Sequence, residues 1–128
     1  MTLSHRVLVR KPFIAQHYLI GGDWGAENFP HSHPYILELE LAGAALDQHN
    51  YLVDIDHIKA CLDDQLSRYS DKLLNDLPEF SGQNPSIELF SRVLCQNLSR
   101  CITAENIHQI TVRLWERDDA WASFTLER

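Results

Sequence analysis

Two histidines lie one residue apart in the segment His31-Ser32-His33. Side chains alternate across an extended chain, so both imidazoles can point to the same side and bind one ion. Neutral imidazole is a preferred zinc ligand, and a catalytic zinc commonly has three protein ligands and one open position. His17 can be the third ligand if its segment pairs with this one as a long hairpin. Such a short pattern also recurs by chance, so alone it favours ordinary loop histidines.

Composition excludes several classes of function. The chain has 128 residues, of which 45% are hydrophobic, and a formal net charge of -7. That charge argues against nucleic acid or an anionic membrane as the main partner. No apolar run approaches the roughly 20 residues that span a bilayer, and the first residues lack the apolar segment of a signal peptide. We therefore expect a single domain over residues 1–128 and a cytoplasmic protein.

The three cysteines are Cys61, Cys95 and Cys101. Their number is odd, they have no CxxC spacing, and they fall in segments with helical periodicity. The pattern predicts buried free thiols in a reducing compartment rather than a disulfide.

Periodicity predicts the elements that would position the histidines. Residues 7–20 suggest a strand that ends near His17, and turn-forming residues follow up to residue 30. Residues 35–41 alternate with a period of two, as a half-buried strand does. Residues 108–115 and 120–126 predict a C-terminal hairpin.

Two helices are predicted between these strands. Residues 54–69 carry an apolar stripe with helical spacing, and a second helix should begin at Asn84-Pro85. Asn is a favourable N-cap, and Pro suits the first helical position. The order ββααββ predicts an α+β fold, in which two helices cover one face of a four-stranded antiparallel sheet.

The chain resembles the 6-pyruvoyl-tetrahydropterin synthase / 6-carboxytetrahydropterin synthase family along nearly its whole length. Six segments match the family's motifs in order and spacing: FIAQH (13–17), HSH (31–33), YLVDI (51–55), LND (74–76), PSIEL (85–89) and WE (115–116). The resemblance implies the T-fold and a homo-oligomeric barrel, typically a hexamer of two stacked trimers with sites between subunits.

The resemblance also implies the site residues. The family's zinc ligands match His17, His31 and His33. The glutamate that binds the pterin ring matches Glu116, whose two oxygens can accept from two adjacent ring N–H groups. Ser86 occupies the place of a pterin-contacting threonine, although a hydroxyl there can equally cap a helix.

The sequence departs from the family at the residues that move protons. Glu27 stands where the family has its catalytic cysteine, four residues before His31. Ser70 and Asp71 stand where the family has an Asp-His pair, and shifting the alignment by one residue still supplies no histidine. Glu27 is the candidate acid/base, since a carboxylate in a dry pocket can have a pKa near neutrality, and Asp71 is a weaker candidate. Each could also be an ordinary exposed acid. His49, His57 and His108 are further candidates for a substitute base.

The expected function is a zinc-dependent lyase acting on 7,8-dihydroneopterin triphosphate or a related dihydropterin. The first expectation is a 6-carboxytetrahydropterin synthase-like activity of the deazapurine (queuosine-type) pathway. The alternatives are a Glu-dependent retro-aldol cleavage to 6-hydroxymethyl-7,8-dihydropterin, for folate synthesis, and an inactive pterin-binding paralogue.

Overall fold

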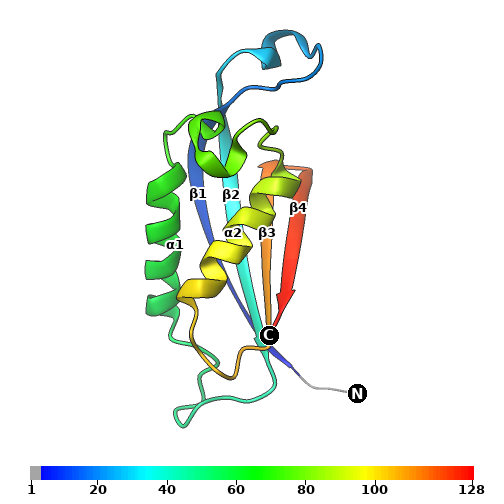
Figure 1. Cartoon of the computed structure of the whole chain (residues 1–128). Coiled ribbons are helices and arrows are strands. Elements are labelled where there is room, and N and C mark those ends of the chain that lie inside the picture. Colours follow the sequence, from blue (N-terminus) through cyan, green and yellow to red (C-terminus); the bar gives the residue numbers. More distant parts are fainter. Residues whose placement is uncertain (1–3) are drawn as a thin grey trace.

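The computed structural model describes residues 4–128 and has an α+β architecture (Figure 1). The elements in chain order are β1 (His5–His17), η1 (Gly25–Asn28), β2 (His31–Gly43), α1 (Ile55–Tyr69), η2 (Leu74–Asp76), η3 (Pro78–Phe80), α2 (Ile87–Cys101), β3 (Gln109–Arg117) and β4 (Ala120–Glu127). The four strands form one antiparallel sheet in the order β1-β2-β3-β4. The predicted ββααββ order and fold class are confirmed.

Both long helices lie on one face of the sheet (Figure 1). The period of two in β2 places its leucines toward them: Leu37, Leu39 and Leu41 are fully buried. Ile110, Val112 and Leu114 of β3 are also fully buried, and they form the matching row on the neighbouring strand. One apolar core therefore lies between the sheet and the two helices.

The β1–β2 hairpin is longer than the alternating pattern alone indicated. Its register runs from His5 opposite Gly43 to His17 opposite His31, so β2 begins four residues before the predicted start at Tyr35. Pro34 lies inside the strand and opposite Ile14. The histidine segment thus belongs to the sheet and not to the preceding loop.

The helix starts agree with the prediction for α1 and differ for α2. The Asp54 side chain accepts from the Asp56 N–H and caps α1. At α2 the N-cap is Ser86, whose hydroxyl accepts from Leu89 N–H at 3.1 Å, and not Asn84. Asn84 instead binds the backbone of Ile20, so a tertiary contact competes with local capping.

The prediction of three free cysteines is wrong for two of them. Cys61 in α1 and Cys101 at the end of α2 form a disulfide, with their Cα atoms 6.0 Å apart. The two residues are 40 positions apart in the chain, so only the packing of α1 against α2 brings them together. Cys95 is free and buried, and burial raises the pKa of its thiol to about 11.

A partly buried ion pair connects α1 to η3. The Arg68 guanidinium donates to both carboxylate oxygens of Glu79 at 2.7 and 2.6 Å, and the Tyr69 hydroxyl donates to Glu79 at 2.7 Å. The hydrogen bond from Arg68 is the main cause that lowers the pKa of Glu79 to about 2. Bidentate pairs of this kind are among the stronger ion pairs in proteins.

We expect Glu79→Gln to lower the free energy of unfolding by about 1–3 kcal/mol at pH 7, as for other hydrogen bonds to charged groups. The pKa of Glu79 is lower in the folded protein than its ordinary 4.5, so its contribution is complete above about pH 4.5 and disappears as the pH falls toward 2. Urea unfolding at pH 7 and pH 3 measures this, with the exposed Glu105→Gln as control. If Glu79→Gln lowered the free energy of unfolding by the same amount at pH 7 and pH 3, the lowered pKa of Glu79 would be contradicted.

Within residues 4–128, the structure contains no helix long and apolar enough to cross a membrane.

Candidate metal centre and active site

In β1 and β2, the row of side chains that faces the core changes from apolar to polar at the same end of the sheet. In β1 the row Phe13, Ala15 continues to His17, which is only 6% exposed. In β2 the row that contains the buried Tyr35 begins with His31 and His33. The antiparallel register places His17 directly opposite His31, and Ala15 opposite His33. The hairpin therefore brings the three predicted ligands to one face.

The imidazole rings of His31 and His33 both lie beside the ring of His17. The ring centroids of His17 and His31 are 4.5 Å apart, and those of His17 and His33 are 5.6 Å apart. Tyr35 lies beneath them and stacks on Phe13 at 5.1 Å, while Phe90 of α2 contacts both aromatic rings edge-on. Close-packed aromatic side chains thus support the histidine cluster from the core side.

Backbone carbonyls determine which ring nitrogen of two histidines is free. Nδ1 of His31 is 2.9 Å from the Phe29 carbonyl oxygen, and Nδ1 of His33 is 2.9 Å from the Pro34 carbonyl oxygen. A carbonyl only accepts, so each Nδ1 carries the proton and each neutral ring has its lone pair on Nε2. Metal-binding histidines typically have such a partner on the second nitrogen.

His17 is held in its neutral form. Burial is the main cause that lowers its pKa to about 4, and the neighbouring His31 and His33 lower it further. Its Nδ1 lies 2.8 Å from the Tyr35 hydroxyl oxygen, which can accept a hydrogen bond from Nδ1–H. In that tautomer the lone pair of the ring is on Nε2. Burial, with a contribution from Glu116, raises the pKa of Tyr35, so the hydroxyl stays protonated.

Glu116 joins the cluster from β3. It follows the buried row Ile110, Val112, Leu114 on the same face, just where the pairing of β3 with β4 becomes irregular between Trp115 and Arg117. Its Oε1 is 3.4 Å from Nε2 of His33, and its side chain is 31% exposed. The structure therefore places the predicted pterin-binding carboxylate beside the predicted metal ligands.

Two asparagines fix the chain where it leaves β1. Asn75 of η2 exchanges two hydrogen bonds with the backbone of Tyr18, both 2.9 Å long. Asn84 does the same with Ile20, at 2.8 and 3.1 Å. Each side-chain amide forms the pair of backbone hydrogen bonds that a neighbouring strand would form. These bonds hold the chain in place directly after His17. Sequence reasoning did not assign this role to Asn75, although the LND motif drew attention to it.

Asp71 lies near Glu116 but apart from the histidines. It has a left-handed backbone with φ of 59°, and its N–H donates to the Ile14 carbonyl at 2.7 Å. Asp71 and Glu116 both line a cavity of about 890 Å³, whose other lining residues include Tyr35, Ile36 and Trp115. The cavity has room for a small planar molecule, and two carboxylates are among its lining residues, whereas none of the three histidines is.

Glu27 and Ser86 occupy different settings. Glu27 lies on η1, in the loop that joins His17 to His31, and its carbonyl accepts from Leu19 N–H at 2.9 Å. Its side chain is exposed, and among the described residues it forms no hydrogen bond with the histidines. Figure 1 shows this loop extending beyond the end of the sheet. Ser86 uses its hydroxyl to cap α2.

The donor set of the cluster fits zinc. Imidazole nitrogens are ligands that this metal favours, two of the three rings are held by backbone carbonyls at Nδ1, and the adjacent carboxylate of Glu116 adds negative charge. Tyr35 is the supporting residue that sequence reasoning missed. Its position in the same alternating row as His31 and His33 was the available signal.

Comparison with solved structures identifies the fold. The 6-pyruvoyl tetrahydropterin synthase of Plasmodium vivax superimposes with a TM-score of 0.82 at 14% identity, covering 98% of this chain and 99% of that chain. The Caenorhabditis elegans synthase gives a TM-score of 0.80 at 17% identity, covering 99% and 97%. A P. vivax synthase altered at a catalytic glutamate gives 0.82 at 13% identity, covering 98% and 99%. These likenesses establish the T-fold.

No curated protein matches the sequence. The sequence does match the family described as 6-pyruvoyl tetrahydropterin synthase over residues 6–127. Apart from His5, the match includes all four strands, together with both long helices and every residue of the histidine–glutamate cluster. This chain belongs to the 6-pyruvoyl tetrahydropterin synthase family.

Proposed function

We propose that this protein is a zinc-dependent lyase that acts on the side chain of 7,8-dihydroneopterin triphosphate or a related dihydropterin. The observation that carries the proposal is the convergence of three histidines with Glu116, whose carboxylate is 3.4 Å from His33. His17, His31 and His33 are the proposed metal ligands. When bound, zinc supplies Lewis-acid polarisation of substrate oxygens at neutral pH.

Glu116 is the proposed anchor for the pterin ring. A carboxylate with two acceptor oxygens matches the two adjacent N–H donors on the ring's guanidine-like edge. It lies on the wall of a cavity that apolar and aromatic side chains also line, which suits a flat heterocycle. Anchoring the ring at Glu116 would bring the substrate close to His33, which is 3.4 Å from that carboxylate. Ser86 is a second proposed contact, although its hydroxyl already caps α2.

We expect Glu116→Gln to weaken binding of a dihydropterin by about 10- to 150-fold, since a hydrogen bond to a charged group contributes about 1.5–3 kcal/mol. The amide keeps the side-chain size but replaces one acceptor with a donor. Fluorescence titration with dihydroneopterin measures the affinity, and Glu105→Gln is the control. Unchanged pterin affinity with normal zinc content would remove Glu116 from the binding site.

Glu27 is the proposed acid/base. It stands in the loop between two metal ligands, where the family has a cysteine, and closing this loop over bound substrate would bring its carboxylate to the reacting atoms. The P. vivax synthase altered at a catalytic glutamate supports a glutamate in this role. Asp71, on the cavity wall, is a secondary candidate.

Two products are proposed, and they differ in the bond that is broken. A 6-carboxytetrahydropterin would serve a deazapurine (queuosine-type) pathway. A retro-aldol cleavage would give 6-hydroxymethyl-7,8-dihydropterin for folate synthesis, and the presence of Glu27 in place of a cysteine favours this second candidate. Incubating zinc-loaded protein with 7,8-dihydroneopterin triphosphate, with products separated by chromatography and identified by mass, distinguishes them. Bound but unchanged substrate would refute the lyase and support an inactive pterin-binding paralogue.

We also propose a cytoplasmic homo-oligomer, with a hexamer of two trimers as the expected form. The sheet face away from the helices exposes large apolar side chains, including Leu8 at 44%, Ile14 at 49% and Trp121 at 48%. Exposed apolar side chains on one face favour an interface with other copies. Light scattering coupled to gel filtration gives the mass of the particle, and a monomer at micromolar concentration would contradict the proposal.

A further inference from the structure

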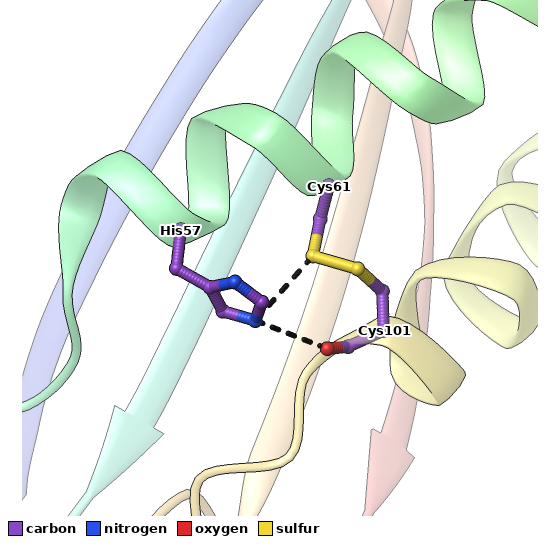
Figure 2. Close-up of side chains that lie close together, drawn as sticks. All are labelled: His57, Cys61 and Cys101. Carbon is purple, nitrogen blue, oxygen red and sulfur yellow. Dashed lines mark hydrogen bonds between the residues drawn. A yellow bond between two sulfur atoms is a disulfide. The ribbon is translucent and has the colours of Figure 1, made fainter.

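A second group of metal-binding side chains lies at the opposite end of the sheet from the histidine cluster. His57 and Cys61 are four residues apart on α1, so their side chains project from the same face of the helix. Cys101, the last residue of α2, faces them (Figure 2). One ligand atom from each of these three residues lies within 4.8 Å of the other two.

The His57 ring lies against both cysteine residues. Its Nε2 is 3.7 Å from Sγ of Cys61 and 3.2 Å from the carbonyl oxygen of Cys101 (Figure 2). A nitrogen atom and a sulfur atom bound to the same tetrahedral zinc are about 3.5 Å apart, because the two bonds are about 2.0 and 2.3 Å long. The histidine is therefore already near the position of a ligand.

Access to this group is open on one side. Cys61 is 1% exposed, whereas His57 is exposed and Cys101 is half-buried. A cavity of about 370 Å³ lies beside them and is lined by His57, Asp54, Ile58 and Ile102, among others. A hydrated cation can reach His57 through it, and Asp54 is also among its lining residues.

We propose that reducing the Cys61–Cys101 disulfide creates a second metal site, in which both thiolates and His57 bind a thiophilic divalent cation such as zinc. The disulfide and the metal site are then alternative forms of the same three side chains. This inference does not depend on the proposed pterin chemistry, because it uses none of the same residues.

The chemical steps balance. A dithiol reductant gives two electrons and two protons to the Cys61–Cys101 bond, which becomes two thiols while the reductant becomes a disulfide. The cation then replaces the two thiol protons, which are released to water. Nε2 of His57 exchanges its contact with the Cys101 carbonyl for the metal, and its proton moves to Nδ1 through solvent. Water from the cavity takes the fourth position.

The backbone permits both forms. The Cα atoms of the two cysteines are 6.0 Å apart, and two thiolates on one zinc need a sulfur–sulfur separation of about 3.8 Å, which side-chain rotation can provide. The disulfide links α1 to α2 in the oxidised form, and the bound metal links the same helices in the reduced form. Reduced protein without metal has no covalent or metal link there.

Cobalt binding tests the proposal, because thiolate ligands give Co²⁺ a near-ultraviolet charge-transfer band that three histidines cannot give. The full-length protein is reduced with a dithiol, desalted without oxygen and titrated with Co²⁺. We expect this band to saturate at one ion per chain in the reduced protein and to be absent in the disulfide form. Cys61→Ser and Cys101→Ser should each lose it.

His57→Ala should weaken this Co²⁺ binding at least tenfold, whereas His49→Ala, a change at another exposed histidine, should leave it unchanged. Counting free thiols by alkylation in denaturant, followed by mass measurement, should give one per chain before reduction, from the buried Cys95, and three after. No thiolate–cobalt band in reduced protein, or an affinity unchanged by His57→Ala, would overturn the three-ligand site. Zinc at the histidine cluster is measured separately in the disulfide form, so failure of either site can be distinguished.

Discussion

The His31→Ala variant is expected to bind zinc at least about 100-fold more weakly than the unaltered protein and to lose turnover. Changing residues that only support a ligand already costs about 10- to 100-fold in metal affinity, so losing a ligand should cost at least as much. His31 is the suitable ligand to change because it lies at the start of β2 and is only partly buried. Its loss leaves the packed core between the helices and the sheet in place.

The measurement is zinc content after dialysis against a competing chelator, followed by turnover of 7,8-dihydroneopterin triphosphate. His5→Ala is the matched control, since His5 is an exposed histidine at the opposite end of the same hairpin. It should retain about one zinc per chain. If His31→Ala kept its zinc, the metal would be bound elsewhere, and the three-histidine assignment would fail.

The second large effect is expected for Glu27→Ala, which should lower turnover by about 10²- to 10⁴-fold, the usual contribution of a general acid or base. Zinc content and particle mass should not change, because the Glu27 side chain is exposed and its backbone contacts with Trp24 and Leu19 do not require a carboxylate. Single-turnover assays with saturating zinc isolate the chemical step. The exposed acid Glu105, changed to alanine, serves as control.

Comparison with Asp71→Ala then identifies the proton-transfer group. A large effect for Asp71→Ala together with normal turnover for Glu27→Ala would assign the role to the acid on the cavity wall. Normal turnover in both variants would mean that neither carboxylate moves a proton. The two acids reach the site from different elements, Glu27 from the hairpin loop and Asp71 from the segment after α1, so their effects should be separable.

The packing around the cluster explains why His17 can stay neutral. His17 is at the end of an apolar row and rests on Tyr35, which in turn packs on Phe13 and Phe90. These aromatic side chains exclude water from one side of the His17 imidazole, and burial disfavours its charged form. The same residues therefore serve the core and the candidate metal centre.

The sequence by itself determined the features that depend on neighbours along the chain. A period of two identified β2 and the leucine row that faces the helices, and helical spacing identified α1 and α2. The HxH spacing placed two imidazoles on one face because alternation is a local property of extended backbone. The order of motifs carried the family resemblance, and with it the assignment of His17, His31 and His33 as one set of ligands.

Only the tertiary structure decided which distant residues meet. Glu116 approaches His33 because β3 pairs with β2, although both long helices lie between these strands in the sequence. Asn84 binds Ile20 in place of capping α2. The disulfide between Cys61 and Cys101 needs α1 to pack on α2, and cysteine spacing alone cannot report a contact across 40 residues. Local preference sets the elements, whereas contacts between distant segments depend on how the whole core packs, which no short stretch of sequence encodes.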